Sequence, residues 1–259
     1  MKALVAAAVF SVLLVGCSGS GEAAESKPSA TPTPVIPSTV GGTVPVPTNT
    51  LSTVKPTDAA VPPEVPEQAT APPPATAGPL SGRNLPTPDK LGAGWKTYVD
   101  PGGAEAGFLG NKTWTRRRDA HQASYEALPS GCSGQPVAGS LPVPQYALSG
   151  TYRTSDTQPA TALLLRFADA AKATAYFTGY QSRMKACGSG GDLSVKGLWS
   201  EDSAAAAVRT YAGAESYVDV SVMHGSTLAL LAATSDKPDT QADWAHGVVP
   251  AFEAVMDSP

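Results

Sequence analysis

The sequence predicts an α+β fold, in which an antiparallel β-sheet arranged as a meander is packed on one face by two or three helices. Two kinds of pattern support this prediction. Several short stretches alternate in polarity with the two-residue period of a strand, and longer ones repeat apolar residues every three or four positions, as a helix does. The connections between the last four strand-like stretches are short, which favours antiparallel pairing of neighbours.

Six stretches are expected to form the main strands. In residues 161–167, three apolar side chains on one face alternate with Leu164 and Arg166 on the other. The other five stretches are residues 146–154, 193–199, 205–211, 217–223 and 227–233. Asp219 alternates with valines in the same way. Because Arg166 and Asp219 lie opposite the apolar faces, both are expected to be exposed, and an ion pair or a ligand contact there is the alternative.

The N-terminal part of the domain has weaker patterns. Residues 85–95 are expected to form a turn or short helix and then enter a strand at Trp95. Residues 119–128 are a predicted short helix that begins at Asp119. The basic run of residues 116–118 is interpreted as the solvated entry to this helix, with a binding patch as the alternative.

Two longer helices complete the prediction. The first follows Asp169, a good N-cap residue, and extends over residues 170–187. One face of this helix would carry Ala173, Phe177, Tyr180, Met184 and Cys187. The last helix covers residues 240–256 and contains Pro250, which is expected to kink or divide it.

The N-terminus has the pattern of an export signal. Residues 3–15 form an apolar run after Lys2 that is much shorter than the roughly 20 residues of a membrane-spanning helix. Residues 14–17, Leu-Val-Gly-Cys, resemble the lipobox of bacterial lipoproteins. This resemblance implies that residues 1–16 are a signal peptide and that Cys17 carries a diacylglycerol, which holds the protein on the outer face of the cell membrane. An ordinary secretory signal with a chance cysteine is the alternative.

Residues 17–83 are expected to be a disordered tether. Their composition is dominated by Pro, Thr, Ala, Ser, Val and Gly, and the first aromatic residue after the signal is Trp95. Such a segment buries too little apolar area to offset the entropy lost on ordering. We therefore expect a single folded domain over residues 84–259.

The two cysteines outside the anchor are expected to form a disulfide. With Cys17 assigned to the lipid, Cys132 and Cys187 remain as a pair in an exported, oxidising setting. They make a poor metal site, since zinc usually takes four closely spaced ligands. Cys187 also lies on the apolar face of its helix, as a buried disulfide requires.

No pattern in the sequence indicates catalysis. Neither a nucleophile elbow nor a phosphate-binding glycine loop is present. The histidines, His121, His224 and His246, have no second metal-type ligand at helical or hairpin spacing, and the adjacent Glu201 and Asp202 are interpreted as a turn. We expect no catalytic residue, cofactor or metal ion. The net charge of −4 gives no reason to expect a nucleic-acid partner.

The folded part has a further resemblance. The lipobox, the Ala/Pro/Thr tether, a cysteine after Pro-Ser-Gly, and residues 167–173 opening a helix that ends in Ala186-Cys187 resemble secreted actinobacterial lipoproteins. Over residues 146–233 the chain is similar to the extracellular sensor domains of mycobacterial Ser/Thr kinases of the PknH type. This resemblance implies an α+β domain with a cleft and two disulfides. Cys132 and Cys187 can form only one here, and the sequence contains no kinase segment.

These observations predict a lipid-anchored surface domain that binds a small apolar or amphipathic envelope molecule or an envelope protein, without catalysis. A protein-interaction or scaffold module is one alternative. An enzyme acting on wall or lipid substrates without a recognisable motif is another. Seven aromatic residues are candidates either to line a pocket or to pack in the core: Trp95, Trp114, Tyr125, Tyr152, Tyr176, Trp199 and Tyr217.

Overall fold

The computed structural model describes residues 71–99, 109–133, 139–154 and 158–258. All of them belong to one compact unit of the chain, residues 53–259. The predicted signal peptide, Cys17 and most of the predicted tether lie outside the described residues. None of the helices in these four ranges is long and apolar enough to cross a membrane.

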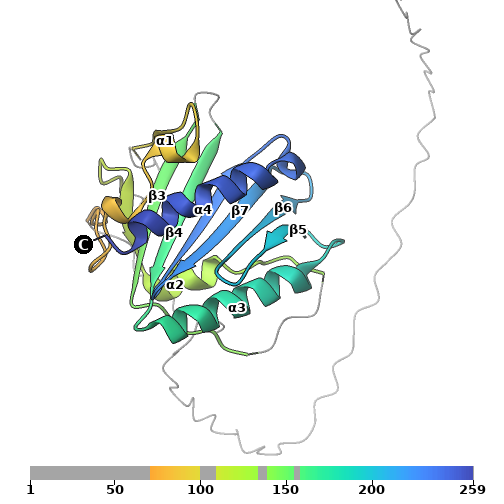
Figure 1. Ribbon diagram of the computed structural model, residues 1–259, viewed down its shortest axis with the longest axis horizontal. Coiled ribbons are helices and arrows are strands. Elements are labelled where there is room, and N and C mark those ends of the chain that lie inside the picture. Colours follow the sequence, from red (N-terminus) through yellow and green to blue (C-terminus); the bar gives the residue numbers. More distant parts are fainter. Residues whose placement is uncertain (1–70, 100–108, 134–138, 155–157, 259) are drawn as a thin grey trace, which may run out of the picture. The chain divides into compact units, whose positions relative to one another are not determined.

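The core of the domain is an eight-stranded antiparallel sheet (Figure 1). Along the sheet the order is β1-β3-β4-β8-β7-β6-β5, and β2 also pairs with β3. The strands are β1 (Lys96–Thr97), β2 (Thr115–Arg118), β3 (Tyr146–Arg153), β4 (Pro159–Arg166), β5 (Leu193–Ser200), β6 (Ala204–Tyr211), β7 (Ser216–His224) and β8 (Thr227–Thr234). The α+β class and the antiparallel meander of the last four strands are confirmed.

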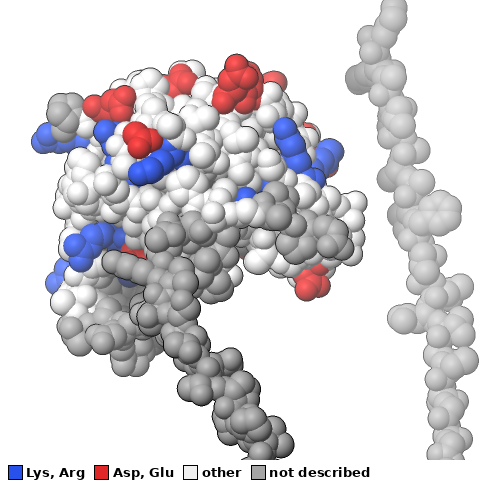
Figure 2. All heavy atoms as spheres, turned by 90° about the horizontal axis from the view of Figure 1, so that it is seen from below, with Lys and Arg blue, Asp and Glu red and all other residues white. Residues whose placement is uncertain are grey.

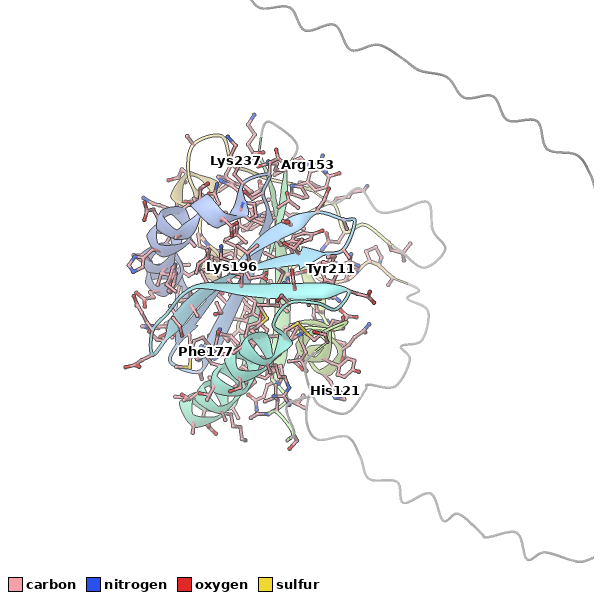
Figure 3. All side chains as sticks on the ribbon, turned by 90° about the vertical axis from the view of Figure 1, so that its right-hand side faces the viewer. His121, Arg153, Phe177, Lys196, Tyr211 and Lys237 are labelled. Carbon is pink, nitrogen blue, oxygen red and sulfur yellow. A yellow bond between two sulfur atoms is a disulfide. The ribbon has the colours of Figure 1, made fainter. Side chains whose placement is uncertain are left out.

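Helices lie on both faces of this sheet, whereas the prediction placed them on one. The helices are α1 (Pro88–Leu91), α2 (Ala120–Glu126), α3 (Ala170–Cys187) and α4 (Ala242–Met256), with short 3-10 turns η1 (Gly82–Asn84) and η2 (Pro238–Thr240). Leu164 belongs to the core under α4, and its neighbour Leu165 to the core under α2 and α3. Figure 3 shows α4 and α3 on opposite sides of the sheet. The middle strands β4 and β8 are largely apolar on both faces, because helices cover both faces of the sheet.

The helix boundaries follow the local signals. Asp119 caps α2 by accepting a hydrogen bond from the backbone N–H of Gln122 at 2.7 Å. Asp169 caps α3 in the same way, at 2.8 Å from the N–H of Lys172. Helix α4 is not divided at Pro250 but continues to Met256. Its buried face, formed by Ala245, Val248, Phe252 and Met256, keeps it on the sheet despite the missing N–H.

The basic run at residues 116–118 is a strand, so its interpretation as a helix entry was wrong. These residues lie in β2 and pair with β3, Arg116 opposite Ser149 and Arg118 opposite Ala147. Strand β2 is only four residues long and polar, so its sequence lacks the alternation that marks the buried strands. The pairing is imposed by β3 rather than by local pattern.

The packed chain begins before residue 84, where the domain boundary was placed. Ala77 and Leu80 are each 1% exposed and belong to the core under α4. The carbonyl of Pro74 accepts a hydrogen bond from the N–H of Arg117 at 2.7 Å. Two apolar side chains in a proline-rich stretch give too weak a signal to separate it from the preceding segment.

Candidate functional site

A groove lies at the outer side of β2, where three parts of the chain far apart in sequence meet. Its volume is about 790 Å³. The lining residues come from the segment before Ala77, from β2 and the start of α2, and from the start of β3; they are Ala71, Pro72, Pro73, Pro74, Ala77, Leu109, Arg116, Arg117, Arg118, Asp119, Ala120, Gln145, Tyr146 and Ala147. We call this the Arg117 groove.

One side of the Arg117 groove is cationic. Arg118 forms an ion pair of 2.5 Å with Glu126 on α2, and both side chains are partly exposed. Arg117 is exposed, and within the described part of the chain no carboxylate pairs with it. A ligand entering here therefore meets one uncommitted guanidinium, a group suited to bidentate contact with a carboxylate or phosphate.

The other side of the groove is apolar. Three consecutive prolines, residues 72–74, line it together with Leu109 and the ring of Tyr146. Tyr146 is 40% exposed and packs over Gly78, where an added Cβ would collide with the ring. Gly78 also has a φ of +57°, which favours glycine. This turn therefore holds an aromatic ring at the groove's edge.

The size and lining of the Arg117 groove suit a small molecule. Ligand pockets typically have volumes of about 300–1,000 Å³ and combine apolar walls with a few polar groups. Apolar side chains beside arginines in one groove favour an amphipathic ligand with an anionic group. On the molecular face drawn in Figure 2, by contrast, Lys and Arg side chains are interspersed with Asp and Glu and separated by uncharged residues.

A second notable feature is a buried ion pair between β6 and β7. Arg209 Nη2 donates to Asp219 Oδ1 at 2.8 Å, and Arg209 Nε contacts Asp219 Oδ2. Asp219 is only 7% exposed, so its predicted exposure was wrong. It faces α3, whose Tyr180 is also buried, because α3 covers the sheet face opposite to α4.

Burial dominates the electrostatics of this pair. Burial raises the pKa of the Asp219 carboxyl, and the Arg209 guanidinium opposes that shift. Burial alone would lower the pKa of Arg209, but the Asp219 carboxylate raises it. Burial also raises the pKa of the Tyr180 hydroxyl. Since both carboxylate oxygens of Asp219 are engaged by Arg209, the pair is suited to holding β6 against β7 rather than to moving a proton.

Sequence reasoning missed Arg209 as the partner of Asp219. Ala207 lies opposite Asp219 and Arg209 opposite Tyr217, so the two charges are diagonal neighbours on one face. The signal was present in the two predicted strands, but it depends on their register. Register cannot be read from alternation alone, and a shift of one residue would place the charges on opposite faces.

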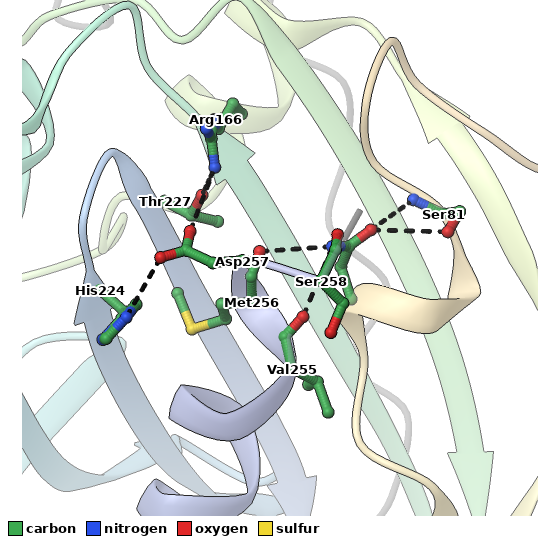
Figure 4. A network of polar contacts seen from close by, with 9 residues as sticks. Ser81, Arg166, His224, Thr227, Val255, Met256, Asp257 and Ser258 are labelled. Carbon is green, nitrogen blue, oxygen red and sulfur yellow. Dashed lines mark hydrogen bonds and ion pairs between the residues drawn. The ribbon is translucent and has the colours of Figure 1, made fainter.

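A polar network joins the start of the packed chain to its end (Figure 4). The buried side-chain amide of Asn84 donates to the carbonyls of Val255, Met256 and Ser258 at 3.4, 3.3 and 2.8 Å. Its oxygen accepts from the N–H of Ser81 at 2.9 Å. Asn84 therefore joins the start of the packed chain to carbonyls at and just after the end of α4.

The same region contains Arg166, which was expected to be exposed. Its side chain is 32% exposed and contacts Asp257 at 3.4 Å and the hydroxyl of Thr227 at 2.8 Å. His224 Nε2 lies 3.1 Å from the other oxygen of Asp257. Asp257 thus sits between two basic side chains at the C-terminal end of α4, and Figure 4 shows this arrangement.

The remaining titratable candidates do not converge. His246 lies 3.1 Å from Glu201, which with Asp202 forms the predicted turn before β6. Among the described residues, no group of three or more His, Cys, Asp or Glu side chains could hold a metal ion. His121 lies in α2, as predicted.

The predicted disulfide between Cys132 and Cys187 is confirmed. It connects the segment after α2 to the last residue of α3, 55 positions later in the chain. Cys187 is 1% exposed, in agreement with its place on the apolar face of the helix. Cys132 also pairs with Leu193 at the start of β5, so the bond fixes α3 against the edge strand.

The aromatic candidates divide between core and surface. Tyr152 and Tyr176 are fully buried, with hydroxyls that donate to the carbonyls of Pro86 and Ser124. Trp95, Trp114 and Trp199 are partly buried against the core under α4, whereas Tyr125 and Tyr217 are half-buried outside it. None of these seven lines the Arg117 groove, whose aromatic residue is Tyr146.

The chain matches no protein-family model, and no curated protein is significantly similar to it.

Proposed function

We propose that the chain is an exported, lipid-anchored binding domain that captures a small amphipathic molecule with an anionic group in the Arg117 groove. The observation that carries this proposal is the composition of the groove, in which prolines and Tyr146 line the same hollow as Arg117, which has no carboxylate partner among the described residues. The groove's volume of about 790 Å³ is in the range of small-molecule pockets. A ligand with an apolar body and an anionic head would contact both walls.

The N-terminal sequence supports the proposed location. The lipobox-like residues 14–17 place Cys17 where a diacylglycerol would be attached, and a proline-rich segment follows. Such a segment is extended in solution and would act as a semi-stiff spacer. The Arg117 groove includes Ala71 and Pro72, so the proposed tether leads directly into one wall of the binding site.

The binding proposal is tested by native mass spectrometry of the full, lipidated chain released from zwitterionic detergent. We expect an extra mass that denaturation removes. Arg117→Gln should lower its occupancy at least about tenfold, since a charge-assisted hydrogen bond is lost. Arg83→Gln is the matched control, because Arg83 is exposed on η1 and lies outside the groove.

Two outcomes would contradict the binding proposal. The first is a chain without any extra mass, which would favour a protein partner and would be followed by crosslinking on the cell surface. The second is an extra mass that Arg117→Gln and Arg83→Gln affect equally. If the protein releases the molecule as a hydrolysis product with a different mass, the result would instead favour the alternative of an enzyme that acts on wall or lipid substrates.

The anchoring proposal makes a separate prediction. Cys17→Ser should abolish the incorporation of labelled fatty acid and the corresponding mass increase, because the serine hydroxyl does not replace the acylated thiol. Cys132→Ser is a control, since it removes a cysteine that is not expected to carry lipid. Unchanged lipid labelling of the Cys17→Ser protein would refute the anchor.

A further inference from the structure

We infer that the hollow between Trp95 and Trp244, which we call the Trp95 pocket, is a second binding site and takes a neutral sugar ring. The Trp95 pocket lies between the chain entering β1 and the start of α4, and its volume is about 150 Å³. Thr154, just after β3, lines it, whereas the Arg117 groove lies at the beginning of β3. The two sites are therefore at opposite ends of one strand, and this inference does not depend on the proposed function.

The two indole rings stack on each other at the pocket and are both only partly buried. Their centroids are 6.2 Å apart and their planes differ by 18°. Trp244 is fixed, because its N–H donates to the carbonyl of Leu91 at 2.7 Å. The indole N–H of Trp95 makes no hydrogen bond to another described residue, so it remains free to donate to a ligand. Stacked aromatic rings are the usual surface for the C–H face of a sugar.

The remaining lining combines the apolar Val218 and Ala233 with uncharged polar side chains. It includes Thr154, Gln158, Ser235 and Gln241, and none of the described lining residues is Asp, Glu, Lys or Arg. The side-chain amide of Gln241 forms no hydrogen bond within the described part of the chain and gives no cap to α4. Amide and hydroxyl groups offer both donors and acceptors, as ring hydroxyls do, without selecting a charge.

The size of the Trp95 pocket limits the ligand. A volume of about 150 Å³ corresponds to roughly five water molecules at about 30 Å³ each. This admits one edge of a sugar ring, with the rest of the ring and of a glycan left in solvent. A single ring with few contacts binds weakly, so the expected dissociation constant is in the millimolar range.

The test uses the full chain in nanodiscs of zwitterionic lipid, since sugar-based detergents would compete. Saturation-transfer NMR and tryptophan fluorescence are measured with N-acetylglucosamine and methyl glucoside as neutral probes and glucuronate as the charged counterpart. We expect saturable binding of at least one neutral probe, with weaker binding of glucuronate. Gln241→Ala should weaken binding about tenfold while leaving the unfolding midpoint unchanged, because this amide has no partner among the described residues.

Two further variants make the result specific. Trp95→Ala should abolish the signal, while Gln145→Ala, the same amide change made in the Arg117 groove, should not alter it. Arg117→Gln should also leave sugar binding unchanged, which separates this site from the proposed function. The inference is overturned if no probe binds saturably, or if binding survives both Gln241→Ala and Trp95→Ala.

Discussion

Replacing Asp219 by alanine is expected to lower the free energy of unfolding by about 3–5 kcal/mol. The substitution leaves the guanidinium of Arg209 in a site where its side chain is only 16% exposed. A buried charge without its partner loses both hydration and the ion pair, and this desolvation cost is much larger than the net value of the intact pair. Urea unfolding followed by circular dichroism measures the change.

Replacing both members of the pair should restore stability. Arg209→Met combined with Asp219→Leu removes both charges and keeps apolar volume on the α3 face, so the double variant should be more stable than Asp219→Ala. Asp239→Ala is the matched control. This substitution also removes an ion pair, in which Asp239 lies 2.9 Å from Lys196. The two side chains are 63% and 68% exposed, so the loss of this pair should lower the free energy of unfolding by less than about 1 kcal/mol.

The outcome distinguishes burial from simple charge pairing. If Asp219→Ala costs no more than Asp239→Ala, water reaches Arg209 and the pair does not hold β6 to β7. If the double variant is less stable than either single variant, the charges contribute more than their desolvation costs. The first result would refute the structural role assigned to this pair, whereas the second would refute the expectation that removing both charges restores stability.

Removing the disulfide is expected to have an effect of similar size. Cys132→Ala with Cys187→Ala opens a connection across 55 residues, for which the chain-entropy model gives about 4 kcal/mol as an upper value. Cys187 is buried and its helix packs on the sheet, so the reduced chain also loses a restraint between α3 and β5. Urea unfolding of the oxidised protein and of the double variant measures the difference.

Reduction of the unmutated protein provides the control for this experiment. Since no side chain changes, it isolates the bond from the loss of two sulfur atoms in the core. Alkylation before and after reduction should show two newly reactive thiols, at Cys132 and Cys187. Stability that is equal before and after reduction would contradict the expected contribution.

Much of the sheet and the longer helices was predictable because their signals are local. Strand β4 carries clear alternation, and α3 has both an apolar face and the capping residue Asp169. Strand β2 was not predictable from such patterns, since it is short and polar and exists by pairing with β3. The spacing of apolar residues marks α3 and α4 as helices, but it does not specify on which face of the sheet each helix packs. The covering of both faces was therefore not predictable.

The candidate site was less predictable than the fold for a geometric reason. The Arg117 groove joins residues 71–77, 116–120 and 145–147, and no spacing within the sequence relates these three segments. The disulfide was inferred from chemistry because only two cysteines remained to be paired. The Arg209–Asp219 pair required the register of two strands, which alternation leaves undetermined.

The hydrogen bonds of residues 73–84 determine how the domain responds to mechanical force. A pull on the chain from its N-terminal side reaches β2 through the contact between Pro74 and Arg117, and then reaches α4 through Asn84. The load is thus divided between an edge strand and the last helix. Because Pro72–Pro74 also form a wall of the Arg117 groove, a molecule bound there would raise the force needed to detach this segment, and tension would in turn weaken binding.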